Sequence, residues 1–305
     1  MHAIRATLAF CIVIVFAAST GGCTRRSVML SPAEKPAQTP LRVMSFNIRY
    51  ATANDGLNHW FLRRDRVVGS IEAFAPHILG TQETLASQRD FLTETLHDYA
   101  VVAVGRDDGK DAGEMTAIFY RRDRFTILDS GHFWLSLEPE KPGSIGWDAA
   151  LTRMASWVKL RDNECPSGKP ILFLNAHFDH AGHAARRESA RLIRRKLAEL
   201  GAGCAIVVTG DFNCTEDDPL YQQLFATDPD ASALRDAYRI ANPQRDPNEA
   251  TFHAFNAGRT QGSRIDWIGI GDDWTVLEAA IDRSLHDGRL PSDHFPVTAV
   301  LRKQL

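Results

Sequence analysis

Six short stretches of this 305-residue chain end in a residue that can bind a metal or move a proton, and this pattern limits the possible folds more than any other feature. The two strongest are Gly210-Asp211-Phe212-Asn213 and Pro291-Ser292-Asp293-His294. A carboxylate beside an amide, and another beside an imidazole, are groups that a metal-assisted attack of water on a phosphate ester requires. Both stretches stand where predicted strands end, so we expect a site built over the edge of a sheet core.

Strand-like and helical patterns alternate from Leu41 onward. Residues 42–47 alternate polar and apolar, whereas residues 64–74 carry apolar side chains at helical spacing until Pro76 ends the helix. Many short strands with helices between some of them predict one α+β domain whose helices cover sheets. The expected strands are 42–47, 78–80, 115–120, 125–129, 155–160, 170–175, 206–209, 265–270 and 297–300, and the expected helices are 64–74, 88–96 and 186–200.

Two pairs of these strands are expected to form hairpins. The charged turn 121–124 would join 115–120 to 125–129, and a turn around Cys165-Pro166-Ser167-Gly168 would join 155–160 to 170–175.

The composition suits a globular protein with an ordinary core, because 44% of the residues are hydrophobic and 24% are charged. The formal net charge is -3, whereas a protein that wraps long nucleic acid usually has a basic balance or a basic stripe. A nucleic-acid substrate would therefore be gripped locally, over few phosphates.

The N-terminus has the pattern of a targeting segment. Arg5 precedes an apolar run over residues 8–18, which is too short to span a bilayer comfortably and is typical of a signal-peptide core. Thr20-Gly21-Gly22-Cys23 resembles a bacterial lipobox, so residues 1–22 are expected to be a signal peptide and Cys23 the lipidated residue. Cleavage at another position, giving a secreted or periplasmic protein, and an uncleaved anchor are the alternatives.

The segment that follows the signal is expected to be a flexible tether over residues 23–40, because it is rich in proline and has no apolar periodicity. The folded domain would then occupy residues 41–305. The expected location is the bacterial cell envelope, and Thr24 in place of an aspartate after Cys23 favours the outer membrane. We expect the chain to be a monomer.

Three cysteines remain in the predicted folded domain. Cys165 and Cys204 both precede predicted strands, and an oxidising compartment would permit a disulfide between them. Unpaired core or loop thiols are the alternative, and the cysteines do not have the spacing of a metal site.

The strand ends supply oxygen ligands for a hard cation. Mg²⁺ prefers carboxylate, amide and water oxygens, usually with one or two carboxylates from the protein. Glu83, Asp293 and Asn47 form the expected ligand set.

The remaining polar residues have expected roles in moving protons and stabilising charge. Asp211 would orient and activate water, and Asn213, two residues further on, would donate to a phosphoryl oxygen. Asp266 would fix the tautomer and the charge of His294. His177 is the second imidazole, and Glu114 is its possible partner.

Taken in order, these motifs resemble those of the endonuclease/exonuclease/phosphatase superfamily, most closely its nocturnin and deadenylase-like branch with the bacterial relatives. The resemblance extends from Leu41 to about Leu301. The motifs that carry it are Ser45-Phe46-Asn47-Ile48-Arg49-Tyr50, Gly80-Thr81-Gln82-Glu83, Gly113-Glu114, Phe133-Trp134-Leu135-Ser136, the segment around His177, Gly210-Asp211-Phe212-Asn213, Arg264-Ile265-Asp266 and Ser292-Asp293-His294.

The resemblance implies a four-layer α/β/β/α sandwich and a divalent metal, Mg²⁺ or Mn²⁺, between the ends of the sheets. It implies that Glu83 is the principal metal ligand, that Asn47 and Asp293 neighbour the metal or phosphate, and that Arg153 lies near the phosphate. It also implies a phosphoesterase whose substrate is either nucleic acid, as in a 3'-5' exonuclease, or a small phosphate ester.

Other interpretations of the same residues remain open. A surface-tethered binding module could keep the sandwich without its chemistry, although such a module could lose Asp211 or His294 freely and both are present. A zinc cluster of His177, Asp179, His180 and His183 is conceivable from their spacing. The arginines of residues 186–195 could touch nucleic acid or form a solvated helix face.

Overall fold

Two six-stranded β-sheets lie at the centre of the computed structural model, which describes residues 39–225 and 233–304. The predicted signal peptide, Cys23 and nearly all of the predicted tether lie outside the described residues. The chain from Gln38 onward forms one compact unit. Within the described residues, no helix combines the length and the apolar character needed to cross a membrane.

The first sheet has the strand order β11-β12-β1-β2-β4-β3. Its central pair, β1 and β2, is parallel, and its other neighbours are antiparallel. The strands are β1 (Leu41–Asn47), β2 (Ile78–Thr84), β3 (Tyr99–Val102), β4 (Met115–Arg121), β11 (Trp274–Ile281) and β12 (Val297–Lys303).

The second sheet repeats this plan with the order β5-β6-β7-β8-β10-β9. Its parallel pair is β7 and β8, and its other neighbours are antiparallel. The strands are β5 (Phe125–Trp134), β6 (Met154–Asp162), β7 (Ile171–His177), β8 (Ala205–Asp211), β9 (Arg235–Asp236) and β10 (Asp266–Ile270).

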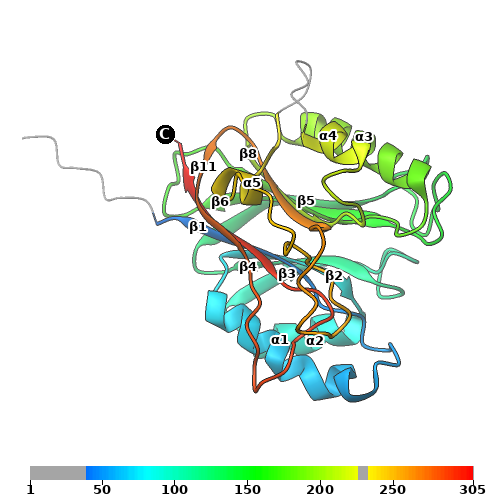
Figure 1. The fold of residues 1–305 in the computed structure, drawn as a ribbon. Helices are drawn as coiled ribbons and strands as arrows, with labels where there is room; N and C mark the ends of the chain where they lie inside the picture. Colours follow the sequence, from blue (N-terminus) through cyan, green and yellow to red (C-terminus); the bar gives the residue numbers. More distant parts are fainter. Residues whose placement is uncertain (1–38, 226–232, 305) are drawn as a thin grey trace, which may run out of the picture. The chain divides into compact units, whose positions relative to one another are not determined.

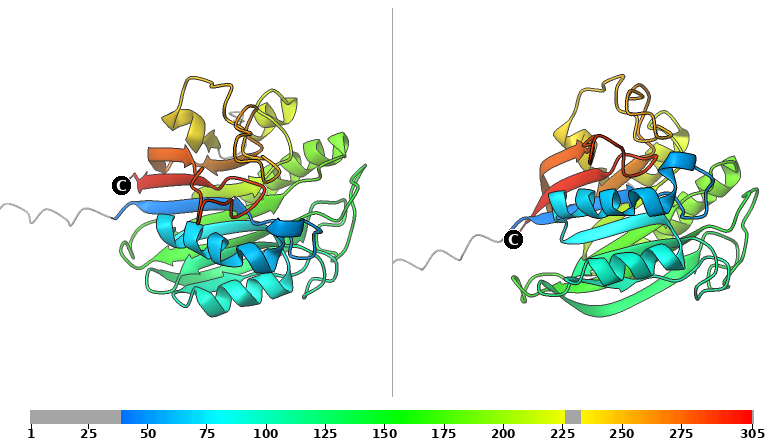
Figure 2. Two further views of the ribbon diagram at one scale, coloured as in Figure 1. Left: turned by 60° about the horizontal axis from the view of Figure 1, so that its bottom comes forward. Right: turned by 90° about the horizontal axis from the view of Figure 1, so that it is seen from below.

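Helices cover the outer face of each sheet, which makes four layers (Figure 1). The helices α1 and α2 lie below the first sheet, where Figure 2 shows them from their solvent side, and α3 and α4 lie above the second. The helical elements are η1 (Gly56–Asn58), α1 (Trp60–Phe74), α2 (Ala86–Thr95), α3 (His183–Leu200), α4 (Pro219–Phe225) and α5 (Ala237–Ala241).

Three apolar clusters fill the spaces between the layers. One joins the two sheets through residues such as Val43 and Phe173, a second packs α1 and α2 on the first sheet around Phe46, and a third packs α3 and α4 on the second sheet around Trp267. Apolar burial on both faces of each sheet accounts for the sandwich. The predicted α+β, four-layer fold is therefore confirmed.

One predicted hairpin is wrong and the other is confirmed. β4 pairs with β2 and β3 of the first sheet, whereas β5 pairs with β6 of the second, so residues 121–124 carry the chain from one sheet to the other. Buried Arg124, whose Nη2 lies 2.9 Å from Asp162 Oδ2 on β6, fixes the end of this crossing. β6 and β7 form the second hairpin as expected.

The cysteine alternatives are also resolved for the described residues. Cys165, Cys204 and Cys214 are free thiols, so the possible bridge between Cys165 and Cys204 does not form in this structure.

Candidate active site

The parallel pair of the first sheet brings the first predicted site residues together. Asn47 ends β1, and in the parallel register it lies beside Gln82, one residue before Glu83. Because β12 runs antiparallel to β1, the residues that precede β12, Asp293 and His294, lie at the same edge. Glu83 has a left-handed φ of 58° within a register shift of β2, a local distortion of the kind that redirects a side chain.

The second sheet contributes its residues in the same way. His177 ends β7 and Asp211 ends β8, and the two are paired in the parallel register. Asp266 begins β10 and is paired with Asp211 in the antiparallel register. The ends of the two central parallel pairs therefore face each other across the sandwich.

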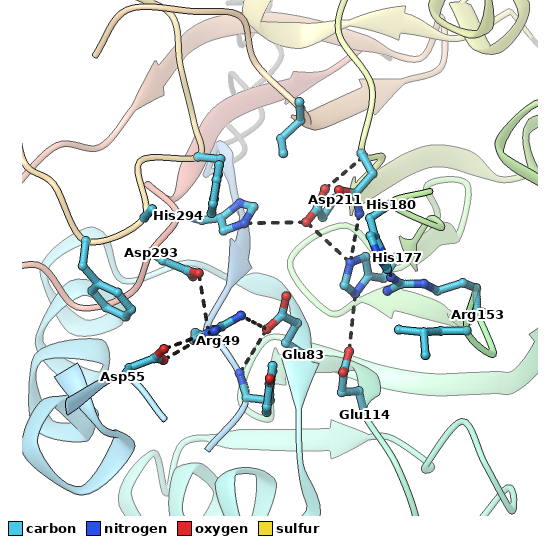
Figure 3. A pocket seen from close by; sticks show the side chains of 17 residues that line it. Arg49, Asp55, Glu83, Glu114, Arg153, His177, His180, Asp211, Asp293 and His294 are labelled. Carbon is cyan, nitrogen blue, oxygen red and sulfur yellow. Dashed lines mark hydrogen bonds and ion pairs between the residues drawn. The ribbon is translucent and has the colours of Figure 1, made fainter. Parts of the chain in front are cut away.

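Two more predicted residues precede strands at this edge. Glu114 comes directly before β4, whose Met115 pairs with Thr84, and Arg153 comes directly before β6. All ten predicted catalytic, metal and supporting residues are thus brought to one region. A cavity of about 570 Å³ lies there, and the residues that line it include Glu83, Glu114, Arg153, His177, Asp211, Asn213, Asp293 and His294 (Figure 3). Asn47 and Asp266 do not line it but hydrogen-bond to residues that do.

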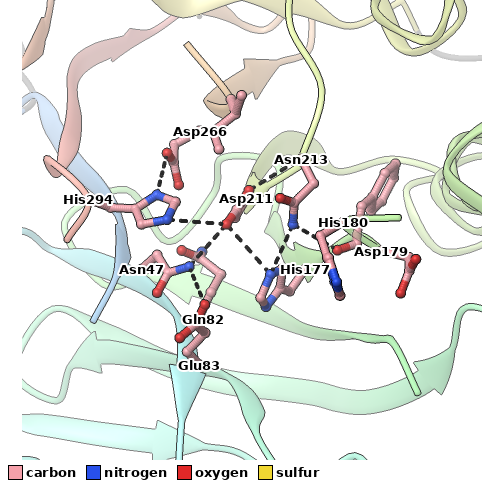
Figure 4. A network of polar contacts seen from close by, with 12 residues as sticks. Asn47, Gln82, Glu83, His177, Asp179, His180, Asp211, Asn213, Asp266 and His294 are labelled. Atoms are coloured by element: carbon pink, nitrogen blue, oxygen red, sulfur yellow. Dashed lines mark hydrogen bonds and ion pairs between the residues drawn. The ribbon is translucent and has the colours of Figure 1, made fainter. Parts of the chain in front are cut away.

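Asn47 links the acidic residues of the two sheets. Its buried Nδ2 donates to Glu83 Oε1 at 3.1 Å and to Asp211 Oδ2 at 3.0 Å (Figure 4). Its Oδ1 accepts a hydrogen bond from the backbone nitrogen of Arg49. In this orientation Asn47 positions the carboxylates, and it would offer its oxygen to a metal only after the amide turned over.

His294 lies between two aspartates. Its Nδ1 lies 2.9 Å from Asp266 Oδ2, and its Nε2 lies 3.8 Å from Asp211 Oδ2. Burial alone would lower the pKa of His294, but the charge and hydrogen bond of Asp266 and the charge of Asp211 raise it to about 10. The imidazole is therefore cationic at neutral pH.

Asp211 is buried and lies near a second carboxylate, unlike an ordinary surface aspartate. Its burial and the nearby charge of Asp266 raise its pKa, although cationic His294 and the hydrogen bond from Asn47 oppose this shift. A carboxylate with a raised pKa is a better proton acceptor than a surface aspartate, which suits a general base.

Asp211, Asp266 and His294 form the one group of at least three histidine, cysteine or acidic residues in the described part of the chain whose potential ligand atoms all lie within 4.8 Å of one another. The Asp266 hydrogen bond already uses His294 Nδ1. We therefore interpret this group as an Asp–His–Asp chain.

His177 is neutral, in contrast to His294. Burial and the cations of Arg153 and Arg106 lower its pKa well below the usual value. Asn213, held at a left-handed φ of 49°, places its Nδ2 3.2 Å from His177 Nε2 and 3.0 Å from the carbonyl oxygen of Phe178. Asn213 therefore lines the pocket and also positions His177 through a contact within the protein.

Glu114 faces His177 at a longer distance than a hydrogen bond. Its Oε2 lies 3.8 Å from His177 Nδ1, and both of its oxygens accept hydrogen bonds from Arg106 at 2.8 and 3.0 Å. Burial raises the pKa of Glu114, and the charge of Arg106 opposes the shift. Sequence reasoning missed Arg106, because it lies eight residues from its partner in a loop without periodicity.

Arg153 lines the pocket and is almost fully buried. Its Nε lies 3.4 Å from Asp179 Oδ2 and its Nη2 lies 3.0 Å from His180 Nδ1, whereas its buried Nη1 has no hydrogen-bond partner among residues 39–225 and 233–304. Asp179 also accepts from the backbone nitrogens of residues 181 and 182, so it braces Arg153 and a loop. The considered zinc cluster of His177, Asp179, His180 and His183 does not form in the described part of the chain, because these residues are not among those whose potential ligand atoms lie close together.

The arginines that follow His183 do not form a nucleic-acid surface as a set. Arg186 is buried and donates to the carbonyl oxygen of Asp179, whereas Arg187 and Arg191 are exposed and pair with Glu188. These contacts favour the interpretation of a helix packed on its sheet with a mixed-charge outer face.

Arg49 and Asp55 are a second pair that sequence reasoning missed. Arg49 donates from Nε and Nη2 to the two oxygens of Asp55, each at 3.1 Å, and both residues line the pocket. Arg49 stands in the motif that includes Asn47, and this position was the available signal.

A polar network between the sheets supports the site from below. Gln82 Nε2 donates to Asn175 Oδ1 at 2.7 Å, and Thr209 donates to the same oxygen at 3.1 Å. A Cβ on Gly80 would lie 2.3 Å from Thr209 Oγ1 and 2.7 Å from the Asn175 side chain, so glycine is needed for this close approach. The network joins β2, β7 and β8. Asn175 and Thr209 lie two residues before His177 and Asp211, which end their strands at the pocket.

The chain is similar to known proteins over nearly all of this fold. The Endonuclease/Exonuclease/phosphatase family matches residues 44–294. A Bacteroides thetaiotaomicron protein of that family is 36% identical, with a TM-score of 0.81, over 88% of this chain and 99% of that chain. A mannosyl-6-phosphatase from Bacteroides thetaiotaomicron is 37% identical, with a TM-score of 0.78, over 86% of this chain and 99% of that chain.

Two further relatives are more distant. The catalytic domain of human nocturnin is 19% identical, with a TM-score of 0.69, over 87% of this chain and 95% of that chain, and this likeness concerns the fold alone. An uncharacterized protein of Acanthamoeba polyphaga mimivirus is 25% identical over 214 residues, which are 58% of this chain. This chain spans 31% of the length of that curated relative.

Proposed function

This chain belongs to the endonuclease/exonuclease/phosphatase family, and on that premise we propose that it is a divalent-metal-dependent phosphoesterase that hydrolyses its substrate by in-line attack of water. The observation that carries the proposal is the meeting of predicted metal, base and phosphate-binding residues around a single pocket.

Glu83 and Asp293 would hold the metal ion. Their carboxylates face the pocket from the two sides of β1, and Asp293 Oδ2 accepts no hydrogen bond from the described residues. Carboxylate oxygens with unused lone pairs suit a hard cation such as Mg²⁺ or Mn²⁺. When bound, such an ion supplies a positive charge that neutralises phosphoryl oxygens.

Asp211 is the group that would accept the proton of the attacking water. Its side chain is held by the amide of Asn47 and the backbone nitrogen of Asn213, so it has a fixed direction. Its raised pKa makes it a stronger base than a surface carboxylate.

Cationic His294 and Arg153 would stabilise the charge that develops on the phosphoryl oxygens. His294 keeps its proton because Asp266 binds Nδ1, which leaves Nε2 directed into the pocket. Arg153 lines the pocket, and its buried Nη1 has no protein acceptor among the described residues, so a turn of the guanidinium toward an anion would break no hydrogen bond of this atom.

We propose that the substrate is a small phosphate ester, with a sugar phosphate as the first candidate. A cavity of about 570 Å³ is within the range of small-molecule sites, which is roughly 300 to 1,000 Å³. The net charge of -3 and the 37% identity to a mannosyl-6-phosphatase support the same choice. A nuclease is the alternative.

A hydrolysis panel tests this proposal. Purified protein is assayed on sugar phosphates, nucleotides and single-stranded oligonucleotides, with Mg²⁺, with Mn²⁺ and with a chelator. We expect metal-dependent release of phosphate from a small ester, and loss of about a thousandfold or more in Asp211→Asn. Asp123→Asn, on an exposed turn outside the pocket, is the matched control.

The outcomes of the panel separate the alternatives. Preference for oligonucleotides would replace the small-ester assignment with a nuclease. Activity that survives complete removal of metal would refute the metal dependence. Absence of hydrolysis on every class would favour a binding module on the same fold.

A further inference from the structure

The backbone of Arg49 is held in an unusual conformation. Its φ of 55° lies in the left-handed region, which is uncommon for a residue with a side chain. Its nitrogen donates to Asn47 Oδ1, and its carbonyl oxygen accepts from Arg63 Nη2 at 2.7 Å and from Gln88 Nε2 at 2.9 Å. These three hydrogen bonds fix the direction in which the side chain leaves the strand end.

The guanidinium of Arg49 then lies among three carboxylates. Among the described residues it hydrogen-bonds only to Asp55, through two contacts of 3.1 Å. It also lies 3.7 Å from Asp293 Oδ2, through Nε, and 3.9 Å from Glu83 Oε2, through Nη1 (Figure 3). The cation is therefore close to both predicted metal ligands while its hydrogen bonds go to a third acid.

The positive charge of Arg49 has opposite effects in the metal-free site and in a site that holds a metal ion. Without a metal, the guanidinium offsets the repulsion between Glu83 and Asp293, whose side chains are only 14% and 7% exposed. A divalent ion bound to the same carboxylates would be repelled by a guanidinium at this distance. Asp55 reduces that repulsion, because its two hydrogen bonds hold the guanidinium away from a direct contact with either ligand.

We propose that Arg49 and the divalent ion compete for Glu83 and Asp293, and that Asp55 sets the outcome by holding Arg49 back. The inference rests on the proposed function, because it needs Glu83 and Asp293 to be metal ligands. Arg49 is a positioning residue in this scheme: it preorganises the carboxylates of the metal-free enzyme and sets the metal concentration at which the site fills.

The two members of the Arg49–Asp55 pair therefore have opposite predicted effects on metal affinity. In Arg49→Gln the competing charge is lost, so Mn²⁺ should bind about tenfold more tightly, the effect expected of one charge a few ångströms from a divalent ion in a water-like dielectric. In Asp55→Asn the guanidinium is released onto Glu83 and Asp293, so Mn²⁺ should bind more weakly. The double variant should behave like Arg49→Gln, because Asp55 acts only through Arg49.

Isothermal titration calorimetry of the substrate-free full-length protein with Mn²⁺ measures these affinities directly. Arg49→Lys keeps the charge, so it should not show the tighter Mn²⁺ binding of Arg49→Gln, and this comparison separates charge from shape. Arg121, at the end of β4, and Asp123, on the turn that follows, form a similar bidentate pair outside the pocket, with contacts of 3.1 and 2.7 Å. Arg121→Gln and Asp123→Asn should leave the Mn²⁺ affinity unchanged.

The result that overturns the inference is a change of the same sign in Arg49→Gln and Asp55→Asn, or no change in Arg49→Gln. Either would mean that the pair only braces the loop. Circular dichroism and thermal melting of each metal-free variant identify unfolding, and in that case Arg49→Lys together with the double variant decides the sign. Failure of the wild type to bind Mn²⁺ or Mg²⁺ would instead refute the metal site of the proposed function.

Discussion

Asp266 Oδ2 accepts a hydrogen bond of 2.9 Å from His294 Nδ1, and both side chains are buried. Position 266 begins a strand of the second sheet, whereas position 294 precedes a strand of the first, so the bond joins the two sheets at the pocket. It fixes the orientation of the imidazole and keeps it protonated.

Replacing Asp266 with Asn should lower the pKa of His294. The wild-type pKa is raised to about 10, so the imidazole stays cationic through neutral pH and loses its proton only in alkaline solution. Without the charge and hydrogen bond of Asp266, the charges of Asp211 and Asp293 still oppose the effect of burial but offset less of it, so the proton is lost at a lower pH. NMR titration of the metal-free protein measures this change, and kcat should fall by roughly a hundredfold.

The same variant makes a second, independent test. The alkaline fall in kcat of Asp266→Asn should begin at a lower pH than in the wild type, whereas KM should change less. An unchanged His294 titration in the folded variant would show that Asp266 does not control the imidazole.

The order and type of most secondary structures could be predicted from local sequence, because the buried side chains of a helix or strand recur at a characteristic spacing. The α3 helix and the β7–β8 pair are examples, since the apolar residues of 186–200 have helical spacing and both strands begin with an unbroken apolar run. The hairpin at residues 121–124 could not be predicted correctly. A charged turn between two strands looks the same whether the strands pair or belong to different sheets.

The site was more predictable than the contacts within it. Strand-end positions placed Asp211 and His177 correctly at one edge, because parallel neighbours end together. Arg106 and Arg49 could not be assigned, since their partners Glu114 and Asp55 are chosen by loop conformation. An arginine in a loop carries no local signal of the carboxylate that it will meet.

Arg63 is predicted to be a major stabiliser of the loops around the pocket. It is buried and donates to the backbone carbonyl oxygens of residues 48, 49, 58 and 291. Arg63→Met would leave these acceptors without their donor, so the free energy of unfolding should fall by about 3 kcal/mol in urea denaturation. Bound Mn²⁺ should then stabilise the variant more weakly than the wild type.

The control for Arg63→Met is Arg66→Met on the same helix. The Nε and Nη2 atoms of Arg66 are buried without a hydrogen-bond partner among the described residues, so its loss should change the free energy of unfolding far less. Equal destabilisation by the two substitutions would show that the carbonyl contacts of Arg63 are not the source of the effect.

We propose that Cys23 is lipidated and anchors the enzyme in the cell envelope. Cys23→Ser should abolish incorporation of radiolabelled palmitate and release the protein from the membrane fraction of a bacterial host. Cys11→Ser, within the apolar run of the predicted signal, is the matched control and should keep the label. Labelling of the Cys23 variant would point to another attachment site.

His77 is predicted to make stability depend on pH far from the pocket. Its Nδ1 accepts a hydrogen bond of 2.9 Å from the backbone nitrogen of Arg42, and burial together with the charge of Arg124 lowers its pKa to about 4. Between pH 4 and about 6.5 the unfolded chain therefore binds more protons at this site than the folded chain, so stability falls as the pH decreases through that window. His77→Asn keeps an acceptor that does not titrate. The urea midpoint of the variant should then depend less steeply on pH in this window than that of the wild type, once the difference between the two proteins at pH 8 is subtracted. Parallel curves would exclude His77 as a source of the acid sensitivity.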